Sequence, residues 1–347
     1  MTAIYYFCTH YKVESFKKFN MREIQFRDAI KEAMSEEMRR DEMVFLMGEE
    51  VAEYNGAYKA SQGMLDEFGP KRVIDTPIAE LGFAGIGVGA AMNGCRPIIE
   101  FMTFNFSLVA IDQVINSAAK VMAMSAGQYS CPIVFRGPTG NAGQLGAQHS
   151  QNFENWFANT PGLKVVVPSN PYDAKGLLKS SIRDNDPVIF MESEQMYGDK
   201  GEVPEGEYLL PLGQAHVIQE GKDVTLVSFG KMIPRVVKPA VEQLQKEGIS
   251  VELIDLRTVR PIDYATVVNS VKKTNRCVVV EEAWPLAAIS SEISYHLQRN
   301  AFDYLDAPVI RVNSMDIPLH YAPTLIEATL PNVERTVKAV KEVLYRK

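Results

Sequence analysis

The chain has 347 residues, of which 46% are hydrophobic and 23% charged, a composition typical of a globular protein with room for two domains. Its formal net charge is −7 and it contains no long run of Lys or Arg, which argues against nucleic acid as a partner. Its cysteines are widely spaced and form no CxxC pair, which argues against a zinc site or a disulfide framework, and no apolar stretch is long enough to cross a membrane.

The first segment, residues 1–20, is rich in aromatic residues and lacks the continuous apolar core of a secretion signal. We expect a disordered extension there. A weak organelle-targeting tail, or a natural start at Met21, is the alternative.

A first domain is predicted at residues 21–197. Apolar residues recur after Phe26 at the three-four spacing of an amphipathic helix, and Asn170-Pro171 marks the start of another helix. Continuous apolar runs predict buried parallel strands at residues 43–47, 97–101, 133–135, 163–167 and 188–191. This alternation predicts an α/β fold with a doubly wound sheet covered by helices on both faces.

A second, smaller α/β domain is predicted at residues 214–347, after a linker at residues 198–213 that is rich in Gly, Pro and acidic residues. Strands are expected at residues 223–229, 251–256, 277–280 and 309–312, and helices at residues 233–247, 264–273, 287–299 and 333–344. Glu281-Glu282 follows one of these strands, and we expect it to form a solvated turn rather than a metal site.

Glu80 opens a predicted helix composed largely of glycine and alanine, shortly after a strand that ends at Asp75. Glycine costs a helix roughly 1 kcal/mol relative to alanine, so the glycines at 82, 85, 87 and 89 need a packing reason. Close approach of a second domain or subunit is the simplest one. Glu80 is then either a partly dehydrated acid that shares a proton with a ligand, or an acid that complements the helix dipole.

Gly85, Gly87 and Ala90 also match a loose form of the dinucleotide-binding fingerprint, so a nicotinamide-dependent dehydrogenase is the remote alternative. That fingerprint belongs in the turn directly after a strand. Here the glycines fall inside the predicted helix, and we treat the match as weak.

Two further candidates follow predicted strand ends, where α/β enzymes keep their sites. The loop at residues 136–150 is rich in glycine, lacks a phosphate-binding GK[ST], and contains His149 near its end. His149 is either a proton-transfer residue or an ordinary loop histidine. Phe104 and Phe106 are either core residues or offer a ring face to a flat heterocycle.

Several long segments carry a resemblance to one family. They are GEEVAEYNGAYK (48–59), RVIDTPIAELGFAGIGVGAA (72–91), RPIIEFMTFNFSLVAIDQVINSAAK (96–120), GAQHSQ (146–151), PGLKVVVPSNPYDAKGLL (161–178) and DLRTVRPID (255–263). Together they resemble the beta subunits of the first component of the pyruvate dehydrogenase complex, from about Met21 to the C-terminus.

The resemblance implies a transketolase-like pyrimidine-binding domain and a transketolase C-terminal domain, in a heterotetramer of two alpha and two beta chains. Thiamine diphosphate would lie between the alpha subunit and this chain. Magnesium would be held by the alpha subunit, since the GDG…N motif that binds it does not occur here.

The activity implied is oxidative decarboxylation of pyruvate, with acetyl transfer to the lipoyl group of the dihydrolipoyl acetyltransferase core, leading to acetyl-CoA. The beta subunit of a branched-chain 2-oxo acid or acetoin dehydrogenase is the alternative. The bacterial cytoplasm is the expected compartment, with the mitochondrial matrix as the alternative.

The resemblance also implies roles for individual residues. Glu80, the glutamate of the TPxxE motif, is expected to hydrogen-bond the aminopyrimidine ring, with Phe106 stacked on that ring and Met102 beside it. His149 matches a loop histidine that steers protons during acetyl transfer, and Glu49 is expected to join a proton path between cofactors. A potassium ion is expected on the backbone carbonyls of Ile133, Ser181, Ile182, Asp184 and Asp186.

Overall fold

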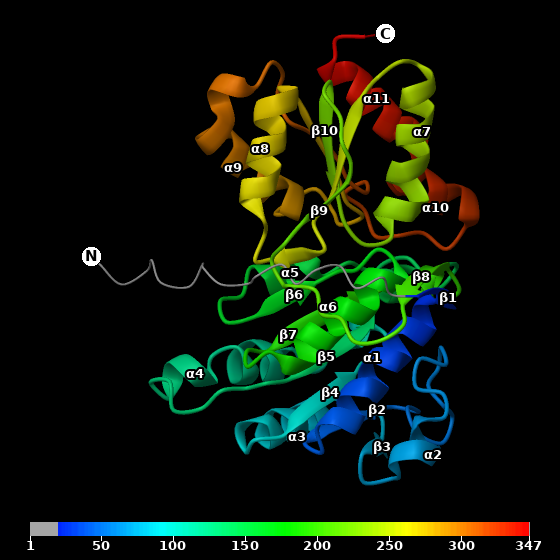
Figure 1. Cartoon of the computed structure of the whole chain (residues 1–347), viewed down its shortest axis with the longest axis vertical. Coiled ribbons are helices and arrows are strands. Elements are labelled where there is room, and N and C mark those ends of the chain that lie inside the picture. The colour runs from blue at the N-terminus through cyan, green and yellow to red at the C-terminus, as the bar shows by residue number, and fades with distance from the viewer. Residues whose placement is uncertain (1–19, 347) are drawn as a thin grey trace.

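The structure, a computed structural model, describes residues 20–346, so the extension expected at residues 1–20 lies outside it apart from Asn20. Two α/β domains follow one another along the chain, and the C-terminal domain stands above the first in Figure 1. Over the described range, no helix combines the length and apolar character needed to cross a membrane.

Parallel strands build most of the sheet of the first domain. They are β2 (Val44–Gly48), β3 (Val73–Asp75), β4 (Arg96–Glu100), β5 (Val134–Pro138), β6 (Lys164–Val166) and β7 (Val188–Glu192). An antiparallel strand, β12 (Thr258–Arg260), completes the order β12-β6-β7-β5-β4-β2-β3. The apolar runs predicted these parallel strands because a sheet covered on both faces needs apolar side chains at successive positions.

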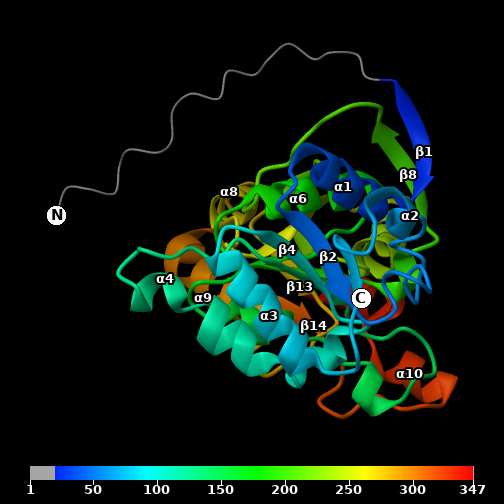
Figure 2. The same ribbon diagram turned by 90° about the horizontal axis from the view of Figure 1, so that it is seen from below.

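Helices cover both faces of this sheet, as the two groups on either side of β2 and β4 show in Figure 2. One face carries α1 (Phe26–Arg40), α2 (Met64–Phe68) and α6 (Pro171–Arg183). The other carries α3 (Glu80–Met92), α4 (Val121–Met124) and α5 (Glu154–Ala158). The predicted start of α6 is confirmed, since the side chain of Asn170 accepts a hydrogen bond from the backbone N–H of Asp173.

The sheet of the C-terminal domain has the order β14-β13-β10-β11-β9. Its strands are β9 (His216–Gln219), β10 (Val224–Ser228), β11 (Val251–Asp255), β13 (Cys277–Val280) and β14 (Ile310–Val312). On one face lie α8 (Tyr264–Thr274) and α9 (Ile289–Ala301), and on the other α7 (Lys238–Lys246) and α11 (Val333–Val343), as Figure 1 shows. The predicted second α/β domain is confirmed.

The two domains interlock. The strand β12 follows β11 of the C-terminal domain, yet it pairs with β6 at the edge of the first domain's sheet. The apolar cluster beneath α3 continues into the C-terminal domain and includes Phe157, Val227 and Val259. The stretch expected as a linker contains β8 (Lys200–Pro204), which pairs with β1 (Met21–Gln25).

A buried polar cluster also joins the domains. The guanidinium group of Arg257 pairs with the carboxylate of Asp173 at 2.6 Å. Asp255 accepts hydrogen bonds from the hydroxyl group of Ser169 and, at 3.0 Å, from the backbone N–H of Arg257. Burial, together with the nearby charge of Asp173, raises the pKa of Asp255 to about 7.

Candidate active site

The residues predicted to form the site follow neighbouring strands at the carboxyl-terminal edge of the first domain's sheet. Glu80 follows β3, Glu49 follows β2, Phe106 follows β4 and His149 follows β5. The strand order changes direction at β2, which has β3 on one side and β4 on the other. Open α/β sheets bind their ligands at such a point.

Glu80 is the first residue of α3, and it is only 6% exposed. The backbone N–H of Thr76 donates to the carbonyl oxygen of Gly48 at 3.0 Å, which ties the turn before α3 to the end of β2. Burial, and then the charge of Glu80, raise the pKa of Glu49 to about 7. Within residues 20–346, Oε1 of Glu49 has no hydrogen-bond partner. The charge of Glu80 therefore acts on a buried neighbouring acid that has an oxygen unpartnered within that range.

The glycines of α3 serve two different purposes. A Cβ atom at Gly87 would lie 2.6 Å from the side chain of Ile99 on the sheet, and one at Gly85 would lie 3.3 Å from Gln113. A Cβ atom at Gly89 would meet no described atom within 4 Å. Packing within this chain therefore accounts for Gly85 and Gly87, whereas Gly89 lies beside open space.

This geometry excludes the dinucleotide-binding alternative. The strand β3 ends at Asp75 and α3 begins at Glu80, so Gly85 and Gly87 lie inside the helix. The fingerprint needs its glycines in the turn between strand and helix, where the backbone can approach a pyrophosphate.

The outer side of α3 exposes large apolar side chains next to Glu80. Ile78 is 85% exposed, Leu81 is 48% exposed and Ile86 is 64% exposed. Apolar side chains gathered on one exposed helix mark a surface that binds another molecule. An apolar surface that residues 20–346 leave uncovered therefore lies beside Glu80.

Phe106 and His149 lie in contact. Their rings meet edge to face, with centroids 5.3 Å apart and an angle of 88° between the planes. Phe106 belongs to the short helix η1 (Phe104–Leu108) and is half-buried, whereas Phe104 is fully buried and packs edge to face on Phe101. Of the two rings that the sequence left open, Phe104 is core and Phe106 is available to a ligand. Met102, directly after β4, is also half-buried.

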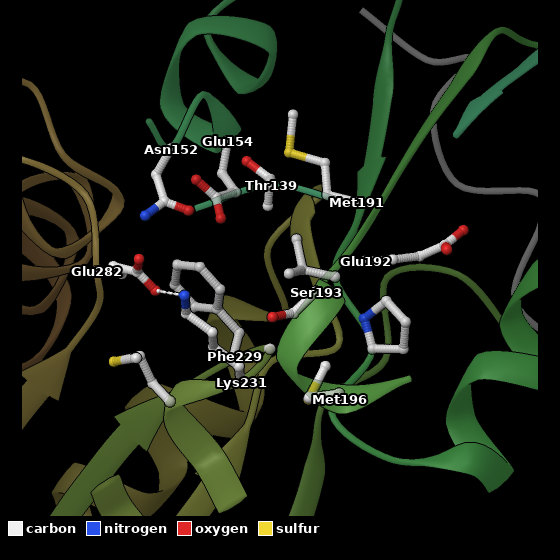
Figure 3. A pocket seen from close by; sticks show the side chains of 14 residues that line it. Thr139, Asn152, Glu154, Met191, Glu192, Ser193, Met196, Phe229, Lys231 and Glu282 are labelled. Atoms are coloured by element: carbon white, nitrogen blue, oxygen red, sulfur yellow. Dashed lines mark ion pairs between the residues drawn. The ribbon is translucent and has the colours of Figure 1, made fainter. Parts of the chain in front are cut away.

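The expectation for Glu281-Glu282 is wrong, because both side chains are buried rather than solvated. Glu282 pairs with Lys231 at 2.6 Å beside a small cavity between the domains, and Glu154 lies on the opposite side of that cavity (Figure 3). Burial, chiefly, raises the pKa of Glu154 to about 8. The sequence held no signal for this cluster, because its members come from distant segments that only the folded domains bring together.

Of the positions expected to bind potassium, Ser181, Ile182, Asp184 and Asp186 lie at the end of α6 or just after it. Ile133 directly precedes β5, and its carbonyl oxygen accepts from the backbone N–H of Val188 at 2.9 Å. Arg96 donates to the carbonyl oxygens of Ile182 and Asp184 at 3.0 and 2.9 Å. A carbonyl oxygen has two lone pairs, so one hydrogen bond leaves the second lone pair for a cation. In the described part of the chain, no three His, Cys, Asp or Glu side chains are arranged to hold a metal.

Comparisons with known proteins agree with this fold. Residues 22–200 match the family described as "Transketolase, pyrimidine binding domain", and residues 213–336 match "Transketolase, C-terminal domain". Among solved structures, "Split gene transketolase, inactive beta4 tetramer" has a TM-score of 0.75 over 93% of this chain and 99% of that chain. At 21% sequence identity, this likeness concerns the fold alone.

Individual relatives identify the family more specifically than the domain matches do. The chain is 56% identical to "Pyruvate dehydrogenase E1 component subunit beta" of Rhizobium meliloti (strain 1021), over 94% of this chain and 71% of that protein. It is 53% identical to "Pyruvate dehydrogenase E1 component subunit beta, mitochondrial" of Dictyostelium discoideum, over 95% of this chain and 94% of that protein. The mitochondrial beta-1 subunit of Oryza sativa is 53% identical over 94% of this chain and 88% of that protein.

Proposed function

Because the chain belongs to the family of pyruvate dehydrogenase E1 component beta subunits, with transketolase-like domains, we propose that it supplies the beta half of a thiamine-diphosphate-dependent active site. The reaction is oxidative decarboxylation of pyruvate with acetyl transfer to the lipoyl group of dihydrolipoyl acetyltransferase, leading to acetyl-CoA. One observation supports this site above all. Glu80 is a buried carboxylate at the switch point of the sheet, within the domain that matches a pyrimidine-binding family.

We propose that Glu80 holds the pyrimidine ring. A buried carboxylate makes a strong hydrogen bond to a ring nitrogen because little water competes with it. Bound thiamine diphosphate supplies the electron sink that decarboxylation needs. We propose that Glu49 joins a proton path between cofactors. Its pKa of about 7, and its oxygen without a partner among the described residues, support this role.

Phe106, Met102 and His149 form the other side of the proposed site. The half-buried ring of Phe106 offers a face on which the pyrimidine can stack, and Met102 supplies a polarisable neighbour. Phe106 and His149 meet edge to face, which holds the imidazole near the proposed stacking ring. We propose that His149 moves a proton during acetyl transfer to the lipoyl group.

The alpha subunit is the proposed partner, in a heterotetramer of two alpha and two beta chains. It would cover Ile78, Leu81 and Ile86, and the open space beside Gly89 would admit its backbone. It would also hold magnesium and the diphosphate, because the GDG…N motif that binds them does not occur in this sequence. The dihydrolipoyl acetyltransferase core is the proposed acceptor.

Potassium is proposed as a structural ion on the carbonyl oxygens at the end of α6. Arg96 already draws two of these carbonyls together, and a cation would satisfy their remaining lone pairs. The melting temperature of the heterotetramer should then be higher in potassium chloride than in choline chloride at equal ionic strength. Equal melting temperatures would contradict this site.

The relatives and the thiols support a proposal for the compartment. Relatives with similar identity come from a bacterium and from mitochondria. Cys95, Cys131 and Cys277 are free thiols, which suits the reducing interior of either compartment. We propose the bacterial cytoplasm, with the mitochondrial matrix as the equivalent place in a eukaryote.

Replacing Glu80 tests the proposed function. Glu80→Gln keeps the shape of the side chain but removes its charge, so pyruvate decarboxylation by the heterotetramer should fall by about 100-fold or more. The mass of the heterotetramer should not change. Glu53→Gln, at an exposed position nearby, is the matched control and should retain its activity. Full activity in Glu80→Gln would show that the role proposed for Glu80 is wrong.

A further inference from the structure

The C-terminal domain holds the backbone of the glycine-rich loop from two directions. The backbone N–H of Asn141 donates to Oε1 of Glu282 at 2.6 Å, and the carbonyl oxygen of Asn141 accepts from Nζ of Lys231 at 2.5 Å. Lys231 and Glu282 pair with each other at 2.6 Å, as the dashed line in Figure 3 marks. Asn141 lies between β5 and the short helix η3 (Ala147–His149), so this contact acts on the loop that ends at His149. We call Lys231 and Glu282 the loop clamp.

The loop clamp is buried and closely fitted. Lys231 and Glu282 are each 7% exposed, and Asn141 is 6% exposed. Gly140 has a φ of +76°, and a Cβ atom there would lie 2.9 Å from Oε1 of Glu282. The loop can therefore approach Glu282 this closely only because residue 140 is glycine.

The charges around the cavity are balanced when the clamp is intact. The cavity has a volume of about 20 Å³, enough for one water molecule, and Glu154, Lys231 and Glu282 all line it. Burial raises the pKa of Glu154 to about 8, so Glu154 is mostly neutral at pH 7. Glu192 also lines the cavity, but it pairs with Arg136 at 2.6 Å. Lys231 and Glu282 therefore balance each other, and removing either leaves the other buried without compensation.

The first domain holds the other end of the same loop. The backbone N–H of Gln151 donates to Oδ1 of Asn105 at 3.1 Å, and the carbonyl oxygen of Gln151 accepts from the backbone N–H of Gly140 at 2.9 Å. His149 contacts Phe106 between these anchors. Most of the residues from 144 to 148 are exposed, so the two anchors set the position of His149.

We propose that Lys231 and Glu282 are positioning residues for acetyl transfer. They fix Asn141 and, through the loop, hold His149 where the lipoyl group arrives, whereas decarboxylation depends on Glu80. In the transfer, the two-carbon unit left by pyruvate is oxidised to acetyl as the lipoyl S–S bond breaks. One sulfur takes the acetyl group as a thioester, and the other takes a proton and becomes a thiol. This inference rests on the proposed function of the same site.

The test compares two reactions of the heterotetramer. One is pyruvate-dependent reduction of ferricyanide, which needs no lipoyl group, and the other is acetylation of a lipoyl domain. Lys231→Met should lower kcat for lipoyl acetylation by about 10- to 100-fold, because a displacement of about 1 Å at a reacting group has an effect of this size. Ferricyanide reduction should stay within about two-fold, and the KM for the lipoyl domain should not change.

Two further variants keep the test decisive. Glu282→Gln preserves the side-chain shape, so it should fold even if Lys231→Met does not, and it should show the same selective loss. Lys200→Met removes an exposed lysine and should leave both reactions unchanged.

Equal losses in both reactions, or no loss in either, would overturn the clamp proposal. Failure of the proposed function is distinguishable from both outcomes. In that case the unmodified heterotetramer would not reduce ferricyanide with pyruvate.

Discussion

Two buried acids of this chain sit in surroundings that disfavour their charged forms. Glu49 has a pKa of about 7 beside Glu80, and Glu154 has a pKa of about 8 in the cavity between the domains. Each has an oxygen without a hydrogen-bond partner in the described part of the chain. Glu49 can change its protonation state during a reaction near neutral pH, whereas Glu154 chiefly affects stability.

The effect of Glu154 on stability depends on pH. Its pKa rises from an ordinary value of 4.5 to about 8 on folding, so between these values the folded chain binds more protons than the unfolded chain. The stability that comes from neutral Glu154 is complete below about pH 4 and is lost as the pH rises through 8. Glu154→Gln is neutral at every pH and should escape this loss.

Calorimetry can measure the difference. The melting temperature of Glu154→Gln, relative to the unchanged protein, should rise between pH 6 and pH 8.5, by an amount that reflects roughly 1.4 kcal/mol per pKa unit. Glu53→Gln, at an exposed position, is the control and should show no such trend. A difference that stays constant or falls with pH would contradict the burial of a neutral acid at this position.

The sequence singled out some candidate residues and overlooked others for a physical reason. Glu80 and His149 lie at strand and loop ends, where local sequence left an ordinary alternative for each, and the resemblance of the long motifs implied their roles. The contact between Phe106 and His149, and the core position of Phe104, required the folded chain. Glu282 was misinterpreted because its burial depends on Lys231, which arrives from a different segment.

At the scale of secondary structure, α3 combines a packed face and an open face. Gly87 lies on the sheet side, where a methyl group would press on Ile99, and Gly89 lies where the described chain leaves space. The cost of glycine in a helix is thus offset at Gly87 by close packing on the sheet. At Gly89 we propose that close approach of the alpha subunit offsets it. Replacing each glycine by alanine tests the packing at that position.

Gly87→Ala and Gly89→Ala should have opposite effects. In the heterotetramer, Gly87→Ala should lower stability by about 1–3 kcal/mol because the core must make room for a methyl group. Gly89→Ala should favour the helix itself by about 1 kcal/mol but weaken association with the alpha subunit. Thermal unfolding and the subunit dissociation constant, from sedimentation, measure the two effects. Unchanged association in Gly89→Ala would mean that no alpha-chain backbone approaches this glycine closely.

Most strands and helices were predictable because their apolar patterns are continuous or follow a clear period. The strands β10, β11 and β13 are buried along their whole length, and Val, Leu and Ile predominate in them. The strands β1, β8, β9 and β12 were missed. The strand β8 lies in a polar stretch, and β12 has only three residues, with Arg260 at its end. The predicted helix at residues 233–247 begins as a π-helical turn, η5 (Ile233–Val237), where Pro234 lacks a backbone donor.

At the scale of the whole molecule, the two domains share a sheet edge, part of a core and a buried ion pair. Arg257 reaches from the C-terminal domain to Asp173, whose side chain is 1% exposed. Sequence patterns report what each segment buries, not which distant segment covers it. The domain order could therefore be predicted, but the interlocking of the domains could not.

Arg257→Met should destabilise the whole chain. It leaves Asp173 without its cation in a buried position, and breaking a buried pair in this way costs about 3–5 kcal/mol. The midpoint of denaturant unfolding of the heterotetramer should fall accordingly. Lys200→Met is the control, because the pair between Lys200 and Glu23 is exposed and should contribute at most about 1 kcal/mol. Similar midpoints for the two variants would show that the Arg257–Asp173 pair does not stabilise the domain contact.

The position of β12 also affects how the chain folds during its synthesis. A ribosome releases the whole first domain before it reaches residues 258–260, so nascent β6 waits with an unpaired edge. An exposed strand edge can pair with another chain. Nascent chains would therefore be most prone to aggregate during this interval. A truncated chain that ends within residues 198–213 would lack β12, so the edge of β6 would stay unpaired.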